Sequence, residues 1–233
     1  MKLPIYLDYN ATTPVDPQVA DAIEPYLREH FGNPSSSHIY GRRAHEAVEQ
    51  AREQVATLIG ARPTEIVFTG CATEANNLAI RGVAHALRHK GRHIITSAVE
   101  HPSVAQPFQR LRDDGWEVSV IPVDSYGRVR TDEVASAQRD DTVLVSIMHA
   151  NNEVGTIQPI KEIAAIAWPR GILLHTDAAQ SVGKIPVSVD SLGVDLLKLA
   201  GHKFYASKGV GALYIRNGTP VKPALVGAGH EGG

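Results

Sequence analysis

The sequence lacks the cysteines that would cross-link the chain or bind a metal through several thiolates. Its 233 residues include a single cysteine, Cys71, which excludes an internal disulfide and a multi-thiolate metal site and favours a cytoplasmic location. An excess of charge of one sign is also lacking, because 23 Lys and Arg face 25 Asp and Glu. No basic stripe is therefore dense enough to attract nucleic acid. No apolar run approaches the roughly 18 residues of a membrane span, so we expect no membrane insertion.

Internal repeats, Pro/Ser-rich linkers and charge blocks are absent as well, and nothing marks a domain boundary. G-x-x-x-x-G-K-[ST] does not occur, and the one G-x-G-x-x-G, GAGHEG at 227–232, neither directly follows a predicted strand nor opens a predicted helix, so the usual nucleotide-binding fingerprints give no support. Hydrophobic residues make up 43% of the chain and charged residues 21%, as is typical of a folded globular protein. These numbers predict one large, packed domain of enzyme size.

Helical stretches alternate along the chain with short runs rich in β-branched residues. Helices are predicted at about 17–31, 40–59 and 73–91, the second ending at Gly60. The predicted strands are 66–69, 93–97, 117–123, 142–148, 172–175, 196–199 and 211–215. Several are almost wholly apolar, which is typical of strands covered on both faces in a mostly parallel sheet. The pattern predicts an α/β fold whose ligands bind beyond the carboxyl ends of the strands.

Polar residues follow these strands at the places where a pocket is expected. The groups are 70–73, 100–101, 151–153, 176–180 and 202–203. The first joins a strand to a helix through small residues, so backbone N–H groups at the helix start and the Thr73 hydroxyl are free to bind an anion such as phosphate. The alternative is an ordinary turn capped by Thr73.

Two charged residues stand beside apolar runs, where an unpaired charge is costly. Asp177 needs a cationic partner, and Lys203 is either paired or a nucleophilic amine with a lowered pKa. A structural Asp177–Lys203 ion pair is one interpretation. Together with the anion-binding turn and His101, the two residues instead provide what pyridoxal phosphate needs: an amine, a carboxylate for the ring nitrogen and a phosphate site.

The remaining histidines and the cysteine give weaker indications. His85 and His89 lie four residues apart on a predicted helix, but off its apolar stripe, so a solvated face is favoured over a metal site. His149 and His175 fall in strand runs and are expected to be hydrogen-bonded core residues. Cys71 is interpreted as a small packing residue. No metal site is predicted.

Several motifs resemble those of one enzyme family. They are YLDYNATTP at 6–14, FGNPSSSH at 31–38, CATEANN at 71–77, VEHPS at 99–103, NNEVGTIQP at 151–159, HTDAAQ at 175–180, GHKFY at 201–205 and KGVGALYIR at 208–216. The chain resembles the class V pyridoxal-phosphate-dependent aminotransferase family and, within it, the cysteine desulfurases. Many of those relatives carry Ser where this chain has Ala200, and Gly where it has Cys71.

The resemblance implies roles for individual residues. Lys203 forms a Schiff base with pyridoxal phosphate, Asp177 pairs with the pyridine nitrogen, and His101 stacks on the ring and takes part in proton transfer. The other implied contacts are Ala72, Thr73 and His202 at the phosphate, and Asn152 and Gln180 near the ring oxygen and the substrate.

The resemblance also implies an architecture and a reaction. Residues 16–233 form the large domain of a fold-type I enzyme, with a mostly parallel seven-stranded sheet and helices on both faces, and residues 1–15 form an arm that reaches the active site. The enzyme converts L-cysteine to L-alanine and passes the sulfur, as a persulfide, to a sulfur acceptor or iron–sulfur scaffold protein. It is expected to act as a homodimer.

Relatives of this family continue further and carry the persulfide-forming cysteine and a substrate-binding arginine in that part. The C-terminal small domain is therefore expected to be absent from this chain, and the 233 residues alone are expected to be inactive. Two alternatives remain open, a selenocysteine lyase and a non-catalytic fragment that binds pyridoxal phosphate.

Overall fold

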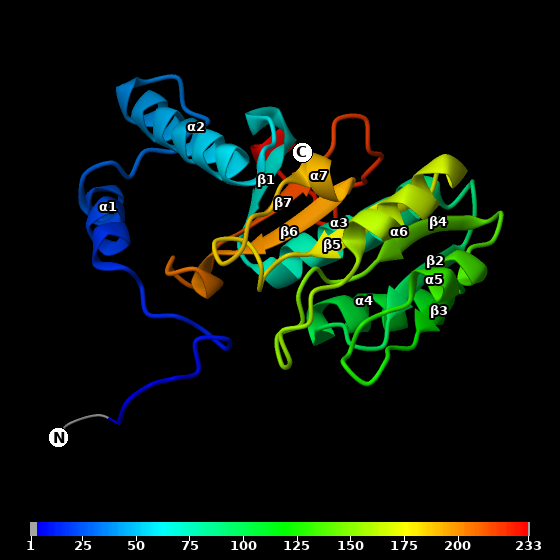
Figure 1. The fold of residues 1–233 in the computed structure, drawn as a ribbon. Coiled ribbons are helices and arrows are strands. Elements are labelled where there is room, and N and C mark those ends of the chain that lie inside the picture. The colour runs from blue at the N-terminus through cyan, green and yellow to red at the C-terminus, as the bar shows by residue number, and fades with distance from the viewer. Residues whose placement is uncertain (1–3, 233) are drawn as a thin grey trace.

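The computed structural model describes residues 4–232 and contains one sheet of seven strands in the order β1-β7-β6-β5-β4-β2-β3 (Figure 1). The strands are β1 (Ile66–Thr69), β2 (His93–Ser97), β3 (Glu117–Ile121), β4 (Thr142–Ser146), β5 (Leu173–Asp177), β6 (Leu196–Ala200) and β7 (Gly211–Ile215). All neighbouring pairs are parallel except those made by β7, which runs antiparallel to both β6 and β1. The predicted α/β class and mostly parallel seven-stranded sheet are confirmed.

Helices cover both faces of this sheet. The helices are α1 (Pro17–Arg28), α2 (Ile39–Ile59), α3 (Ala72–Leu87), α4 (Pro102–Asp113), α5 (Thr131–Ala137), α6 (Ile160–Ala167) and α7 (Val189–Leu192). Helices α3 and α4 pack on one face, and α5, α6, α7 and the end of α2 pack on the other. Within residues 4–232, none of the helices has the length and apolar character needed to cross a membrane.

Alternate residues of the central strands supply two separate cores. In β2, Ile94 packs with α3 and α4, whereas Ile95 faces the opposite layer. Leu144 and Val145 of β4 divide in the same way. Successive side chains of a strand point to opposite faces, so an apolar residue at every position is what a sheet buried on both sides requires.

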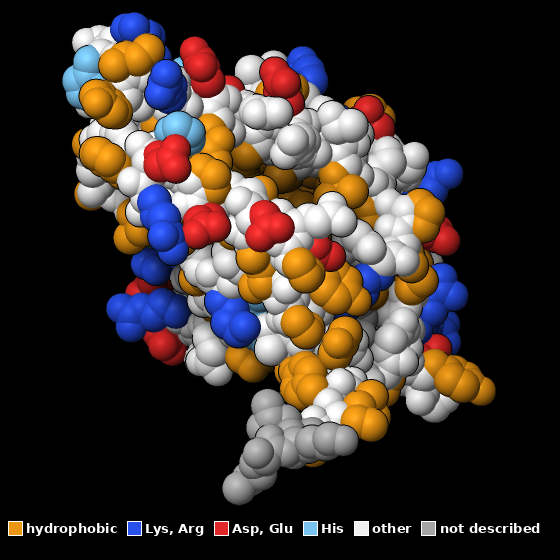
Figure 2. Space-filling view, turned by 90° about the vertical axis from the view of Figure 1, so that its left-hand side faces the viewer, with side chains coloured by type: hydrophobic (Ala, Val, Ile, Leu, Met, Phe, Trp, Pro, Cys, Tyr) orange, Lys and Arg blue, Asp and Glu red, His pale blue; other side chains and the backbone are white. Residues whose placement is uncertain are grey.

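The N-terminal part of the chain is packed much less closely. Helix α1 begins at Pro17 after an Asp16 cap that accepts a hydrogen bond from the backbone of Gln18, yet it buries none of its residues. In Figure 1 it stands away from the sheet. Leu27 and Phe31 are 76% and 72% exposed, and Figure 2, which faces this side of the molecule, shows many hydrophobic side chains at the surface.

Most predicted elements are present, with differences at their ends. Helix α2 ends at Gly60 in the left-handed conformation, as predicted. The strand predicted at 142–148 ends at Ser146, although Ile147 and His149 still donate backbone hydrogen bonds to β5. The helix predicted to reach residue 91 ends at Leu87 because the chain there tightens into a turn. Helices α4 to α7 were not predicted from the sequence.

Candidate active site

An open pocket of about 280 Å³ lies at the carboxyl ends of the central strands, beside the start of α3. Residues from the segments after β2, β4, β5 and β6 contribute to its wall. The structure brings all of the predicted site residues together there: Ala72, Thr73, His101, Asn152, Asp177, Gln180, His202 and Lys203. Predicted site residues up to 131 positions apart in sequence therefore share one cavity, as expected where parallel strands end at a common edge.

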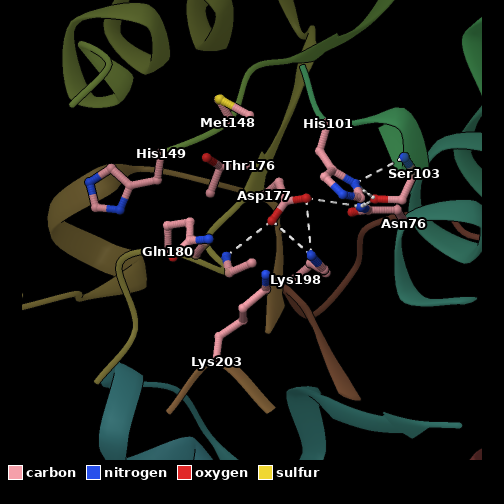
Figure 3. A network of polar contacts seen from close by, with 12 residues as sticks. Asn76, His101, Ser103, Met148, His149, Thr176, Asp177, Gln180, Lys198 and Lys203 are labelled. Carbon is pink, nitrogen blue, oxygen red and sulfur yellow. Dashed lines mark hydrogen bonds and ion pairs between the residues drawn. The ribbon is translucent and has the colours of Figure 1, made fainter. Parts of the chain in front are cut away.

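Asp177 ends β5 and is the centre of a buried network (Figure 3). Its Oδ1 accepts hydrogen bonds from Lys198 Nζ at 2.9 Å and from the backbone N–H of Ala179 at 3.0 Å. Its Oδ2 accepts from Asn76 Nδ2 at 3.0 Å and from Lys198 Nζ at 3.1 Å. Burial alone would raise the pKa of Asp177, but the charge of Lys198 and these hydrogen bonds lower it to about 2. The carboxylate is therefore ionised throughout the physiological range.

Lys203 does not form the ion pair with Asp177 that the sequence left open. It ends a short turn after β6, and Figure 3 shows its amine directed toward the Asp177 network. Its Nζ donates to the backbone carbonyls of Asn10 at 2.6 Å and Ala11 at 2.8 Å. Burial, together with the positive charges of Lys198 and Lys184, lowers the pKa of Lys203. Within residues 4–232 the amine thus donates to two backbone carbonyls and forms no ion pair with a carboxylate.

The N-terminal segment is tied to the turn that carries Lys203. Buried Thr13 donates its backbone N–H and its hydroxyl to the carbonyl of His202, at 3.0 and 3.1 Å. The same hydroxyl accepts the N–H of Tyr205 at 2.9 Å, and Tyr205 has a positive φ of 68°. A non-glycine residue in the left-handed region is uncommon, and the bond to Thr13 holds it there.

His101 caps α4 and is fixed by Ser103. Its Nδ1 accepts the backbone N–H of Ser103 at 3.1 Å and lies 2.8 Å from the Ser103 hydroxyl. That hydroxyl also accepts from Asn76 Nδ2 at 2.9 Å, which links His101 to the Asp177 network. Burial lowers the pKa of His101. Because a backbone N–H can only donate, Nδ1 is unprotonated and the neutral ring carries its proton on Nε2.

The start of α3 offers free hydrogen-bond donors to the pocket. Cys71 is the N-cap, and its sulfur accepts the backbone N–H of Glu74 at 3.4 Å. Within residues 4–232 the backbone N–H groups of Ala72 and Thr73 have no partner. Strand β7 passes close beneath them, because a Cβ on Gly211 would lie 2.9 Å from the nitrogen of Ala72. Any residue other than glycine at position 211 would press a side-chain atom against the start of α3.

Three further predicted residues make contacts at the rim. Gln180 Nε2 donates to the carbonyl of Asn10 at 2.9 Å, and Gln180 Oε1 accepts from Lys184 at 2.6 Å. Nδ2 of Asn152 donates to the adjacent Glu153 at 2.7 Å. His202 Nδ1 lies 3.2 Å from the hydroxyl of Thr12. The first and last of these contacts join the N-terminal segment to the rim.

Sequence reasoning missed Lys198 and Asn76. Lys198 lies in the apolar run of β6, which predicts only a strand, and Asn76 lies inside α3. A lysine in an otherwise apolar strand was the available signal for Lys198, because such a charge needs a buried partner. The parallel register, which places it opposite Asp177, comes only from the structure.

His149 and His175 match their predicted core position only in part, because His149 lies after β4 and not in a strand, and Nε2 of His175 has no hydrogen-bond partner within residues 4–232. Nδ1 of His149 lies 2.9 Å from the Ser181 hydroxyl, and Nδ1 of His175 lies 2.8 Å from the Ser146 hydroxyl. Both are buried. Residues 4–232 contain no group of three or more His, Cys, Asp or Glu side chains placed to hold a metal ion.

The sequence is similar to a known family over almost its whole length. The family model described as aminotransferase class-V matches residues 5–231. A protein named cysteine desulfurase IscS from Dictyoglomus turgidum is 55% identical over 231 residues, which cover 99% of this chain and 59% of that relative. A protein of the same name from Methanosarcina thermophila is 50% identical over 227 residues, which cover 97% of this chain and 56% of that relative. The chain thus spans somewhat more than half the length of these relatives.

Solved structures resemble the fold closely. A NifS-like protein superposes with a TM-score of 0.96 at 44% identity, over 99% of this chain and 64% of that one. SspA in complex with cysteine superposes with a TM-score of 0.94 at 42% identity, over 98% of this chain and 66% of that one. These matches confirm the predicted fold-type I large-domain fold.

Proposed function

Because the chain belongs to the class V aminotransferase family, we propose that it is the pyridoxal-phosphate-binding part of a cysteine desulfurase. The observation that carries this proposal is the convergence of Lys203, Asp177 and the free N-terminus of α3 on one pocket. The identities of 55% and 50% to cysteine desulfurases support the same function.

The start of α3 fits the phosphate of pyridoxal phosphate. The N–H groups of Ala72 and Thr73 are free, and they stand where the helix dipole favours an anion. The Thr73 hydroxyl and the His202 ring line the same pocket. Because residue 211 of β7 is glycine, no side-chain atom presses against these backbone groups. We assign Ala72, Thr73 and His202 to the phosphate.

The groups deeper in the pocket fit the ring and its reactive carbonyl. Asp177 is an ionised acceptor suited to the pyridine nitrogen, and Asn152 and Gln180 line the same pocket. When bound, pyridoxal phosphate supplies an electron sink for the carbon next to a substrate amine. The lowered pKa of Lys203 enlarges its neutral, nucleophilic fraction, so we assign Lys203 to covalent attachment of the cofactor.

His101 is assigned to ring contact and proton transfer. Ser103 occupies its Nδ1, and the proton of the neutral imidazole is therefore held at Nε2. Burial, which lowers the pKa of His101, keeps the ring neutral at physiological pH. In this state Nε2 of His101 is available to donate a hydrogen bond, and the ring adds no positive charge beside Lys203.

We assign L-cysteine as the substrate, with L-alanine as the product and the sulfur carried on a cysteine as a persulfide. The cysteine desulfurase relatives and the similarity to SspA in complex with cysteine support this assignment. The persulfide would pass to a sulfur-acceptor or iron–sulfur scaffold protein in the cytoplasm. A small C-terminal domain like that of the longer relatives would complete the active site. The predicted arm of residues 1–15 would also contribute to the site, although residues 1–3 of it lie outside the described residues.

A homodimer completes the proposal. Apolar side chains of the N-terminal segment and of α1 and α2 are exposed, and a second copy would cover them. They include Ile5, Leu7, Leu27, Ile39 and Tyr40, and Phe31 in the connection between α1 and α2 is exposed as well. Analytical ultracentrifugation of wild type and of Leu27→Glu tests this, because the variant should shift the protein toward monomer.

Reduction with borohydride tests cofactor attachment. The protein is incubated with pyridoxal phosphate, reduced, digested and mapped by mass spectrometry. The pyridoxyl group is expected on Lys203, and Lys203→Ala should remove it. A label on Lys198, the other lysine in the pocket, would contradict the assignment, and an unlabelled protein would contradict cofactor binding.

Sulfur release tests the substrate. The chain is mixed with a C-terminal fragment of a cysteine desulfurase relative, and sulfide and alanine are measured with L-cysteine. Equal yields of the two products are expected under reducing conditions. Selenide from L-selenocysteine with no sulfide from L-cysteine would instead identify a selenocysteine lyase.

A further inference from the structure

Lys198 is a second lysine in the pocket, and no role in the proposed reaction accounts for it. It lies on β6 directly opposite Asp177 of β5 in the parallel register. Its side chain is 4% exposed, as is that of Asp177, and its Nζ contacts both carboxylate oxygens, at 2.9 and 3.1 Å. It also forms part of the pocket wall. Lys198 is therefore a buried, fully paired part of the site.

The carboxylate of Asp177 has no acceptor site to spare. A carboxylate offers about four lone-pair sites, and in this structure each oxygen already accepts two hydrogen bonds. Lys198 donates to both oxygens, Ala179 to Oδ1 and Asn76 to Oδ2. A protonated ring nitrogen needs one of these sites, so one donor must give way when the cofactor binds.

Lys198 is the donor best able to move. The Ala179 donor is a backbone N–H fixed by the chain. The Asn76 amide is fully buried in α3 and is held by a second hydrogen bond to the Ser103 hydroxyl. The ammonium of Lys198 is a compact charge on a flexible stem, and it can keep one carboxylate oxygen while releasing the other.

We propose that Lys198 is a positioning residue that shares the Asp177 carboxylate with the ring nitrogen of pyridoxal phosphate and so weakens the contact this nitrogen makes. This inference rests on the proposed function. Two cations then divide one carboxylate, and the ammonium also disfavours a like charge on the nearby ring nitrogen. Without Lys198, the protonated ring nitrogen would be the only cationic partner of Asp177.

The strength of the ring-nitrogen contact can be measured by binding alone. Pyridoxal phosphate is compared with 1-deazapyridoxal phosphate, which carries C–H in place of the ring nitrogen. Equilibrium dialysis gives the two dissociation constants, and their ratio reports the contact between the ring nitrogen and Asp177. We expect a ratio within about threefold in wild type and at least about tenfold higher in Lys198→Met, where a charged hydrogen bond is restored to full strength.

A matched control and a second variant complete the experiment. Lys161→Met on α6 removes an exposed lysine outside the pocket and should keep the wild-type ratio. Lys198→Gln serves in its place if Lys198→Met does not fold. It keeps a polar side chain but removes the charge, and it should also raise the ratio. If Lys198 only stabilised the fold, its replacement would lower stability without changing the ratio of the two dissociation constants.

The outcomes separate this inference from the proposed function. A ratio that stays unchanged in both Lys198 variants, or a wild-type ratio above about 100, would overturn the role of Lys198 while leaving cofactor binding intact. A wild-type protein that binds neither compound would overturn the proposed function, and this inference with it.

Discussion

The buried pair of Asp177 and Lys198 makes each residue dependent on the other. Sequence reasoning assigns Asp177 to the cofactor, so that Asp177→Asn should change stability little. In the structure the same substitution leaves the Lys198 ammonium buried without its counter-charge. Breaking a buried pair costs about 3–5 kcal/mol, so Asp177→Asn in the cofactor-free protein should lower the free energy of unfolding by about that amount.

A double-mutant cycle measures this coupling. Urea unfolding is compared for wild type, Asp177→Asn, Lys198→Met and the double variant. The double variant should be more stable than Asp177→Asn alone, because removal of both charges leaves no unpaired group. Additive losses would show that the two residues do not act as a pair.

Glu100 makes stability depend on pH. Burial raises its pKa, and hydrogen bonds from Ser97 and from the backbone of Met148 oppose this effect. The resulting pKa is about 8. A carboxyl with a pKa raised on folding contributes stability below its unfolded pKa and loses it as pH rises toward the folded value. Between about pH 5 and 8, wild type should lose about 1.4 kcal/mol per pH unit through this group.

Glu100→Gln should remove that loss, because glutamine resembles the protonated acid. Urea unfolding at about pH 5, 6.5 and 8 gives the free energy of unfolding of wild type and variant. The contributions of other titrating groups cancel in the difference between the two proteins. Glu162→Gln on the exposed side of α6 is the control and should track wild type. A difference that is constant with pH would contradict the raised pKa.

At the scale of elements, β7 and α3 meet so closely that one methyl group matters. A Cβ at Gly211 would lie 2.9 Å from the backbone of both Cys71 and Ala72 and 3.0 Å from Thr69 Oγ1. Gly211→Ala must push back the start of α3, which costs about 1–3 kcal/mol as overpacking does. Because the same N–H groups are assigned to the phosphate, pyridoxal phosphate should bind at least about tenfold more weakly.

Thermal unfolding and equilibrium dialysis measure the two effects. Gly227→Ala is the matched control, because a Cβ there meets nothing within 4 Å. It should change neither stability nor affinity. Wild-type affinity in a destabilised Gly211→Ala would separate the packing at this junction from phosphate binding.

The sequence predicted strands better than helices for a physical reason. Strands buried on both faces stand out because they are largely apolar: β4 has polar residues only at its two ends, and Lys198 is the one polar residue of β6. Helix α4 contains Pro107, a residue that normally breaks a helix, and α7 is only four residues long. The site residues were found because they follow the strands, whereas Lys198 lies inside one and needs the register to be seen.

At the scale of the whole molecule, the position of the single thiol limits what these 233 residues can do. Cys71 caps α3, and its sulfur is engaged with the N–H of Glu74 at 3.4 Å. A rigid strand-to-helix turn cannot carry it to a substrate sulfur, although persulfide formation requires contact between the two. The chain alone should therefore release no sulfide catalytically from L-cysteine.

Sulfide assays with the isolated chain check this expectation, with Cys71→Ser as the comparison. Both proteins should give only the background rate of free pyridoxal phosphate. Turnover by wild type that Cys71→Ser abolishes would identify Cys71 as the nucleophile and contradict its role as a cap.

The bond from Thr13 to His202 joins residues 189 positions apart, and this has a consequence for the order of folding. Closing so long a loop is slow compared with forming local helices. The pocket rim is therefore finished only after the segments that carry Thr13 and His202 have met, and the cofactor is captured by a nearly folded protein instead of acting as a nucleus for folding. In stopped-flow refolding, the cofactor signal should appear after the helical signal has reached its plateau.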